Sequence, residues 1–430
     1  MESVDYIVVG AGSAGCALAY RLDTDSPHST VLLLEAGSTA RNPMLHIPLG
    51  FAFLLKPHKN NWGYRTQAEP YLNQREIDLP RGKVLGGCSA INGMVYVRGQ
   101  AEDFDRWAEL GNNGWAYKDV LPYFKRSEDC ENGANAYHGS GGPLWVGNVN
   151  NEFPICDDFI KAAQQAGHPL NQDVNAASQE GVGYFQLNQK GGKRWSSAAA
   201  FLGKDVCKRK NLVIATKSVA AKILFHKTRA IGVHYLDSKG QIQEVAAMQE
   251  VILAAGALNT PTLLELSGIG QRNVIESHGI ELKHELPGVG ENLQDHYHVQ
   301  VQHGVNKGVT ISDDGKFPRV VFNVFKYLFT KRGLLAFPAA NIGAFYKTAG
   351  DTRPSMQIHF TPGAGGMDEK GNMTPSPVPG VNSTTCVLRP EARGHVHIRS
   401  TDPKAPPKIL YNYLTNENDC KRAVDGVKKQ

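Results

Sequence analysis

Three glycines and one carboxylate near the N-terminus of this 430-residue sequence stand at spacings that suit ligand binding. Gly10, Gly12 and Gly15 form the pattern Gly-x-Gly-x-x-Gly, and Glu35 follows at about the 20-residue offset at which a carboxylate reaches a ribose hydroxyl. In such a pattern the first glycine allows a tight turn, the second lets backbone amides approach a pyrophosphate, and the third lets a helix pack on a strand. The pattern therefore predicts a dinucleotide site, with a chance glycine turn as the alternative.

The segments around these residues have the order needed to position them. Residues 4–9 form an apolar run that ends at the first glycine, residues 13–22 carry small and apolar side chains at helical spacing, and residues 31–34 read as a buried parallel strand. This order is that of a doubly wound α/β unit in which the helix N-terminus faces phosphate. It does not distinguish NAD from FAD. Beside the glycines, the candidate site residues are Ser13, Ala14, Glu35 and Ala36.

Composition excludes several classes of protein. Hydrophobic residues make up 41% and charged residues 20%, which is typical of a globular chain and not of a disordered one. The net charge of +5 is scattered apart from short clusters such as residues 208–210, so we expect no nucleic-acid partner. No apolar run reaches the ~18 residues of a membrane span, and the N-terminus lacks a basic signal-like region. We therefore expect a cytoplasmic protein, with peripheral membrane contact left open.

Cysteines and paired histidines offer weaker signals. The seven cysteines are odd in number and none forms a Cys-x-x-Cys pair, so we expect reduced, mostly buried thiols. The pairs His296/His298 and His395/His397 could suggest metal ligands. Alternation along a strand places such pairs on one face for structural reasons too. We expect no metal site.

The rest of the chain gives a coarser outline. We expect loops and short elements over residues 40–80, a helical region over 102–128 broken by Gly111, Gly114 and Pro122, and a surface excursion over 130–150. Residues 212–253 alternate and indicate a strand meander, followed by a helix over residues 260–266.

Three long segments carry the most specific signal. Residues 81–99 read RGKVLGGCSAINGMVYVRG, residues 256–270 read GALNTPTLLELSGIG, and residues 287–296 read PGVGENLQDH. In this order and spacing they resemble the signatures of the glucose–methanol–choline (GMC) oxidoreductase family, and most closely its choline dehydrogenases and bacterial alcohol dehydrogenases. The resemblance extends from residue 4 to about residue 425.

The resemblance implies FAD as the cofactor. Glycines at 86 and 87 agree with this, because they let the backbone approach a flat ring. In the family reaction an alcohol loses a proton from oxygen and a hydride from carbon to the flavin, which gives an aldehyde or ketone; the electron acceptor is unknown. The implied cofactor residues are Val84, Gly86, Gly87, Ser89, Asn92, Gly93, Met94 and Val95 on the flavin side, Val219 at the adenine, and Ala255 and Gly256 along the dinucleotide.

Three departures from the family pattern matter. Cys88 stands where most members carry serine, glycine or threonine, either as a tolerated small residue or as a reactive thiol. Ile91 replaces the histidine that choline oxidases join to the flavin, so FAD should be bound non-covalently. Residues 389–419 resemble the start of the family's C-terminal segment, but no histidine of this chain matches the catalytic pair that this segment carries. The resemblance places that pair beyond Gln430 and leaves the catalytic residues of this chain unknown, with His296 and His298 as weak substitutes.

These observations predict a doubly wound, Rossmann-like FAD-binding domain at residues 1–155 and 205–300, interleaved with an α+β substrate-binding cap at 156–204 and 301–430. The predicted function is oxidation of a choline-like or aliphatic primary alcohol. A lyase or decarboxylase of the same fold, or a non-catalytic FAD-binding fragment, is the alternative. Trp62 resembles a position near the substrate mouth, where it would either hold an ammonium group by cation–π contact or pack in the core.

Overall fold

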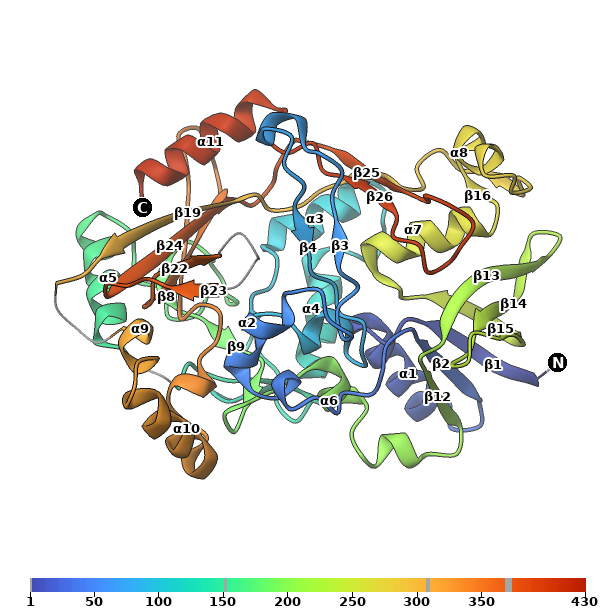
Figure 1. Cartoon of the computed structure of the whole chain (residues 1–430), viewed down its shortest axis with the longest axis horizontal. Coiled ribbons are helices and arrows are strands. Elements are labelled where there is room, and N and C mark those ends of the chain that lie inside the picture. Colours follow the sequence, from blue (N-terminus) through green and yellow to red (C-terminus); the bar gives the residue numbers. More distant parts are fainter. Residues whose placement is uncertain (1, 151–152, 307–309, 368–372) are drawn as a thin grey trace.

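The computed structural model describes residues 2–150, 153–306, 310–367 and 373–430. Its largest sheet has six strands in the order β12-β2-β1-β15-β14-β13 (Figure 1). The strands are β1 (Glu2–Val9), β2 (Val31–Glu35), β12 (Leu212–Thr216), β13 (Val219–His226), β14 (Arg229–Leu236) and β15 (Ile242–Leu253).

The pairing of these strands confirms a parallel core and corrects one prediction. Strands β12, β2, β1 and β15 run parallel, and every residue of β2 is buried, as expected for a central parallel strand. Strands β13, β14 and β15 form the antiparallel meander. The predicted meander over residues 212–253 is wrong at its start, because β12 pairs in parallel with β2 instead of joining β13. Alternation identifies a strand but not the edge to which it adds.

Helices cover both faces of this sheet. On one face α1 (Ser13–Asp25) and α6 (Ser197–Phe201) pack with Val8 of β1 in one apolar cluster. On the other face α7 (Gly256–Leu266) packs in a second cluster with Ile7. Neighbouring residues of β1 point to opposite faces, so a continuous apolar run serves both clusters. This is the doubly wound arrangement that the sequence predicts.

A second sheet of five antiparallel strands lies on the opposite side of the molecule (Figure 1). In the order β19-β24-β21-β20-β8, its strands are β19 (His298–Gly304), β24 (Gly380–Val387), β21 (Met356–Thr361), β20 (Ile342–Tyr346) and β8 (Gly181–Tyr184). Its members come from separate stretches of the sequence, and strands β12 to β15 of the first sheet lie between β8 and β19 in the chain.

The two faces of the second sheet differ in polarity. Met356, Ile358 and Phe360 point to an apolar face that is covered by α5 (Pro154–Gln165) and α11 (Glu417–Lys428). The alternate residues of the same strands, among them Gln357 and His359, point the other way.

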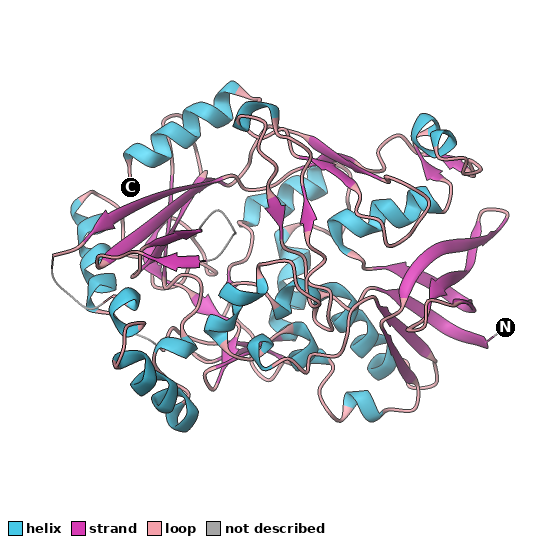
Figure 2. Ribbon diagram, in the orientation of Figure 1, coloured by secondary structure: helices cyan, strands magenta, loops and turns pink. Residues whose placement is uncertain are grey.

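Shorter elements lie between and around the two sheets (Figure 2). The helices are α2 (Phe51–Leu54), α3 (Ala101–Glu109), α4 (Tyr117–Ser127), α8 (Arg272–Ser277), α9 (Ile311–Asp314) and α10 (Arg319–Thr330), with 3-10 turns η1 (Pro43–Leu45), η2 (Pro48–Gly50), η3 (Pro70–Leu72), η4 (Gly87–Ala90), η5 (Val206–Lys208) and η6 (Leu334–Ala336). The short strands are β3 (Tyr64–Arg65), β4 (Asp78–Leu79), β5 (Val95–Tyr96), β6 (Glu128–Cys130), β7 (Leu144–Val146), β9 (Gln186–Leu187), β10 (Gln189–Lys190), β11 (Lys193–Arg194), β16 (Ile269–Gly270), β17 (His284–Glu285), β18 (Glu291–Leu293), β22 (Gly365–Met367), β23 (Met373–Pro375), β25 (Gly394–His397) and β26 (Lys408–Leu410).

The predicted helical region over residues 102–128 is interrupted as expected at its glycines, between α3 and α4. Pro122, however, lies inside α4 and does not end it, so that part of the prediction is wrong. The proline removes a hydrogen bond to the carbonyl of Lys118. Both residues are exposed, so water can satisfy that carbonyl and the helix continues.

Candidate cofactor and substrate site

A cavity of about 520 Å³ opens where β1, β2 and β15 end, at the N-termini of α1 and α7. Its volume lies within the range of small-molecule sites, roughly 300–1,000 Å³. The carboxyl ends of parallel strands are where doubly wound sheets bind their ligands. Of the residues predicted from the sequence, the cavity is lined by Gly10, Gly12, Ser13, Ala14, Glu35, Ala36, Gly87, Val219, Ala255 and Gly256.

The three glycines of the first turn differ in what surrounds them. Gly10 has a φ of +98°, and a Cβ there would lie 2.6 Å from the carbonyl oxygen of Ala254. A Cβ on Gly15 would lie 1.8 Å from the carbonyl oxygen of Gly10, so this glycine packs the helix on the turn and does not line the cavity. Gly12 has no neighbour within 4 Å of its Cβ position and lines the cavity. Of these three glycines, only Gly12 therefore leaves open space for a ligand.

Glu35 reaches the cavity with its carboxylate already oriented. Its Oε2 accepts a hydrogen bond of 3.0 Å from the amide of Ala11, and its Oε1 accepts one of 2.7 Å from the amide of Gly37. Burial raises the pKa of this carboxyl to about 7, although the two amide donors oppose that rise. Each oxygen keeps a second lone pair, which is free to accept a ribose hydroxyl.

The loop predicted to face the flavin packs on the glycine turn at Gly86 and Gly87. The amide of Gly86 donates to the carbonyl of Ala11 at 2.8 Å, and a Cβ on Gly87 would lie 2.7 Å from the Cα of Gly12. Contact is therefore backbone to backbone, which requires glycine. The remaining predicted flavin neighbours lie outside the lining of the cavity; they are Val84, Gly86, Ser89, Asn92, Gly93, Met94 and Val95.

Two of these residues hold the loop together. The hydroxyl of Ser89 donates to the carbonyl of Gly86 at 2.6 Å and accepts from the amide of Ser197 at 2.9 Å. The Oδ1 of Asn92 accepts from the amide of Met94 at 3.1 Å. Met94 has a φ of +65°, in the left-handed region that non-glycine residues rarely adopt. The Asn92 side chain thus supports a strained backbone at the centre of the loop.

Arg194, which the sequence reasoning missed, supports the same loop. Its Nη1 donates to Oδ1 of Asn92 at 2.8 Å and to the carbonyl of Ser89 at 3.2 Å. The side chain is 3% exposed, and its Nε and Nη2 have no partner within the described residues. Burial lowers the pKa of Arg194 to about 10. Nothing in the sequence marks which of the 46 basic residues is buried, so no signal could have found it.

Trp62 lines the cavity but already contacts a cation. The ring stacks on Tyr64 with a centroid distance of 5.4 Å, and Nζ of Lys83 lies 4.3 Å from the ring centroid. Burial lowers the pKa of Lys83. Cys88 also lines the cavity, with its sulfur 3.5 Å from the amide of Gly82, whereas Ile91 is buried in an apolar cluster away from it.

The polar face of the second sheet carries two stacked histidines. The rings of His298 and His359 lie 5.7 Å apart, and Nδ1 of His359 is buried without a hydrogen-bond partner within the described residues. Burial lowers the pKa of His359 to about 3, so this imidazole is neutral. None of the described histidines lines the large cavity.

One of these histidines belongs to a group with metal-ligand spacing. Ligand atoms of His296, His298 and Cys386 lie within 4.8 Å of one another. Burial raises the pKa of the Cys386 thiol to about 12, and a protonated thiol is a poor metal ligand. In the other histidine pair, His395/His397, the ring of His397 contacts carboxylates, with Nδ1 2.6 Å from Glu265 and Nε2 3.1 Å from Glu291.

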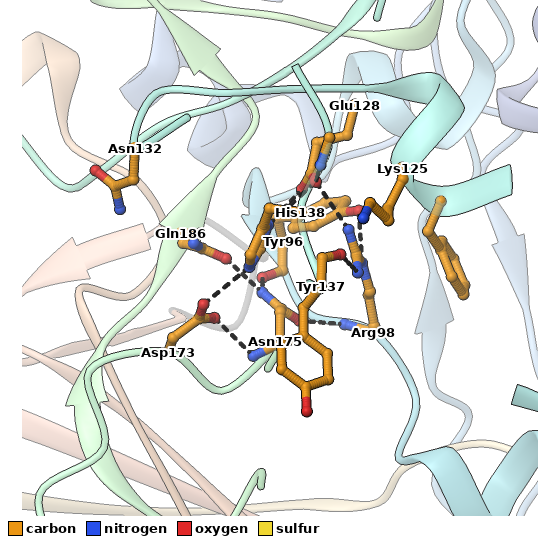
Figure 3. A network of polar contacts seen from close by, with 12 residues as sticks. Tyr96, Arg98, Lys125, Glu128, Asn132, Tyr137, His138, Asp173, Asn175 and Gln186 are labelled. Carbon is orange, nitrogen blue, oxygen red and sulfur yellow. Dashed lines mark hydrogen bonds and ion pairs between the residues drawn. The ribbon is translucent and has the colours of Figure 1, made fainter. Parts of the chain in front are cut away.

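A buried ionic network, also missed from the sequence, lies beneath the loop that follows β6 (Figure 3). Glu128 pairs with Arg98 at 2.9 Å and with Nδ1 of His138 at 3.0 Å, and Nε2 of His138 bonds Asp173 at 2.8 Å. Hydrogen bonds to the two carboxylates raise the pKa of His138 to about 9. The segment 130–150 is therefore not only a surface excursion, since His138 anchors it in the interior.

Fold and site together define a doubly wound dinucleotide-binding protein. The model of the GMC oxidoreductase family matches residues 4–298. An alcohol dehydrogenase (acceptor) from Pseudomonas putida is 42% identical over 429 residues, which are 99% of this chain and 77% of that relative. An oxygen-dependent choline dehydrogenase from Sinorhizobium fredii is 42% identical over 419 residues, which are 97% of this chain and 75% of the relative.

The solved structures agree with these relatives. A formate oxidase from Aspergillus oryzae RIB40, in which FAD modification was studied, superposes with a TM-score of 0.90 at 25% identity and covers 99% of this chain and 80% of that one. The chain belongs to the GMC oxidoreductase family. The predictions of the family, the fold class, FAD as cofactor and an oxidoreductase acting on CH–OH groups are confirmed.

Proposed function

We propose that this protein oxidises a primary alcohol, choline-like or aliphatic, to the aldehyde, with electrons passed on to an acceptor that stays unidentified. The observation that carries the proposal is the cavity in which the open Gly12 backbone and the oriented Glu35 carboxylate meet. Bound FAD supplies the electron chemistry by accepting hydride from the carbinol carbon. The chain's own residues bind the cofactor and orient the alcohol beside it.

The residues at the cavity fit an FAD dinucleotide. Gly12 and Gly256 leave space that a Cβ would occupy, so backbone amides can approach the pyrophosphate. The N-terminus of α1 favours its negative charge. Glu35 would accept hydroxyls of the adenosine ribose, and Val219 would lie at the adenine. We propose that attachment is non-covalent, since Ile91 offers no nucleophile and is buried away from the cavity.

Among alcohols, we favour an uncharged substrate over choline. The relatives named above act, by their names, on alcohols and on choline. Nζ of Lys83 already lies over Trp62, where an external ammonium would bind by cation–π contact. A second cation at that ring would meet like charge. An aliphatic chain meets no such penalty against the ring stacked on Tyr64.

The division into domains is part of the same proposal. We place the FAD-binding domain at residues 1–155 and 205–300 and the substrate cap at 156–204 and 301–430. The two sheets support this division, because the strands of the first sheet lie within the former and the cap sheet draws β8, β20, β21 and β24 from the latter.

Two measurements test the proposed function. Acid precipitation of the purified protein should release FAD, identified by mass, and colour retained in the pellet would contradict non-covalent binding. Anaerobic addition of primary alcohols should bleach the flavin and produce the aldehyde. A lyase or decarboxylase would instead form product with the flavin oxidised at the end of each cycle. A chain that binds FAD and is bleached by no alcohol would be a cofactor-binding fragment.

Glu35→Ala should weaken FAD retention by roughly 1.5–3 kcal/mol through the lost charged hydrogen bond.

A further inference from the structure

Helix α10 presents its apolar side to solvent. Phe322, Phe325 and Phe329 are 68%, 56% and 84% exposed, and Leu328 is 56% exposed. The preceding Phe317 is 82% exposed. Helices on globular proteins normally turn this stripe inward. Contiguous exposed apolar surface of this kind marks an interaction site more often than an accident of packing.

The side of α10 that faces the protein is held by polar contacts. The amide group of Asn323 donates to the carbonyl of Arg319 at 3.1 Å, and its Oδ1 accepts from the amide of Leu334 at 3.3 Å. The hydroxyl of Tyr327 donates to the carbonyl of Gly192 at 3.1 Å. Asn323 and Tyr327 are both buried. The bonds to Leu334 and Gly192, which lie outside α10, fix which way the helix faces, so the phenylalanines point outward because of the fold.

The charges around this surface have one sign. Residues 316–332 contain five basic residues and no acidic one. Arg319, Lys326 and Arg332 are exposed and make no ion pair within the described residues. Lys316 pairs with Asp313 at 3.6 Å, and Nζ of Lys331 lies over the ring of Tyr327 at 4.9 Å. Three cations thus remain available to a partner with negative charge.

We propose that α10, together with Phe317, docks this protein on an anionic lipid bilayer. An amphipathic helix with aromatic residues on one side and basic residues beside them lies in the interfacial plane of a membrane. Anionic headgroups would meet Arg319, Lys326 and Arg332 while the phenylalanines enter the acyl boundary. The charge argues against a second copy of this chain, because a twofold contact through α10 would bring the same cations together.

The position of α10 suits this docking. It lies at the edge of the molecule, beside α9 and away from the sheet that carries the cofactor cavity (Figure 1). No helix in the described part of the chain is long and apolar enough to cross a bilayer. The proposal stands independently of the alcohol-oxidising function.

Sedimentation of the FAD-loaded protein with vesicles tests the proposal. Phosphatidylcholine vesicles mixed with phosphatidylglycerol should bind the protein, and phosphatidylcholine alone should bind it about tenfold or more weakly. The triple variant Phe322→Ser/Phe325→Ser/Phe329→Ser should lose about tenfold or more of the binding to mixed vesicles. Phe53→Ser/Tyr71→Ser/Tyr123→Ser is the matched control, because it removes three aromatic rings of similar mean exposure elsewhere on the surface and should bind as the parent does.

The charge is tested separately. Arg319→Glu/Lys326→Glu/Arg332→Glu should abolish the preference for phosphatidylglycerol, whereas Lys118→Glu/Lys227→Glu/Lys239→Glu, at exposed lysines of other elements, should keep it. Three outcomes would overturn the proposal. These are absence of vesicle binding, equal loss in the control triples, and a solution dimer that the phenylalanine triple dissociates, which would identify a second copy as the occupant.

Discussion

The two ends of the proposed cofactor site, with the adenosine at Glu35 and the flavin at residues 84–95, are built by different means. At the adenine end, glycines set the shape of the backbone, and Glu35 is oriented by amides two and 24 residues away in sequence. At the flavin end, Ser89 and Asn92 are held by Arg194 and Ser197, more than 100 residues further along the chain. A local motif therefore defines the first end, whereas long-range side-chain contacts define the second.

The buried charges of the two ends also differ. Burial raises the pKa of Glu35 to about 7 even though its carboxylate has two amide donors. Burial lowers the pKa of Arg194 to about 10, and among the described residues no carboxylate forms an ion pair with it. Each end of the proposed site therefore holds a buried charge that burial disfavours, a negative one on Glu35 and a positive one on Arg194. Cofactor binding should relieve the first through ribose hydroxyls.

The largest expected effect distinguishes a glycine that the fold of the turn requires, Gly15, from one that leaves room for a ligand, Gly12. Gly15→Ala places a Cβ 1.8 Å from the carbonyl oxygen of Gly10, so we expect a loss of about 3 kcal/mol or more in the free energy of unfolding of the FAD-free protein. Gly12→Ala meets no atom and should leave that free energy unchanged while FAD retention falls. Denaturant unfolding of both apo variants measures the difference. Equal destabilisation by both alanines would show that the turn is not divided in this way.

A second prediction concerns the pH dependence that Glu35 imposes on the FAD-free protein. Because the folded-state pKa is raised from 4.5 to about 7, the folded protein holds this proton more tightly than the unfolded chain does. Stability from this group is greatest below the unfolded pKa and falls as pH rises toward 7, by about 3 kcal/mol at most. Glu35→Gln removes the titrating group. It should therefore flatten the plot of unfolding free energy against pH between about pH 4 and 8, a range that spans the unfolded and folded pKa values of Glu35. A variant profile that keeps the parent's slope would place the titration on another group.

The flavin end should respond to Arg194. Arg194→Met removes the donors to Asn92 and Ser89, so the strained backbone at Met94 loses its support and FAD retention should weaken by about 2 kcal/mol. The stability of the FAD-free protein should change less, because a buried unpaired cation is removed at the same time. Arg194→Lys keeps the charge and one donor and should restore part of the affinity. Isothermal titration with FAD and the visible flavin spectrum report both effects. Unaltered affinity and spectrum in Arg194→Met would mean that the loop does not depend on this side chain.

The same contrast explains what the sequence could predict. The turn at Gly10, the buried strand before Glu35 and the helix that opens at Ser13 follow from local steric and hydrophobic patterns, so their placement needed no tertiary information. Residues such as Asn92 entered only through resemblance to a family. Arg194, and the network of Glu128 with His138, could not be predicted, because each depends on which distant segments meet in the fold. The prediction of the strand that pairs with β12 was wrong for the same reason.

The smallest predicted effect concerns Trp62 in the lining of the cavity, whose ring contacts the ammonium of Lys83. Lys83→Met frees the ring face, so choline should gain about 0.5–1 kcal/mol of binding, seen as a lower KM for choline, while the KM for a neutral alcohol of similar size stays the same. Lys190→Met is the matched control: its ammonium lies 4.4 Å from the ring centroid of Trp145, and neither residue lines the cavity. FAD retention is measured alongside, since a change there would confound the comparison. If both alcohols improve equally, Lys83 acts on the cavity as a whole and the preference for uncharged substrates does not arise at Trp62.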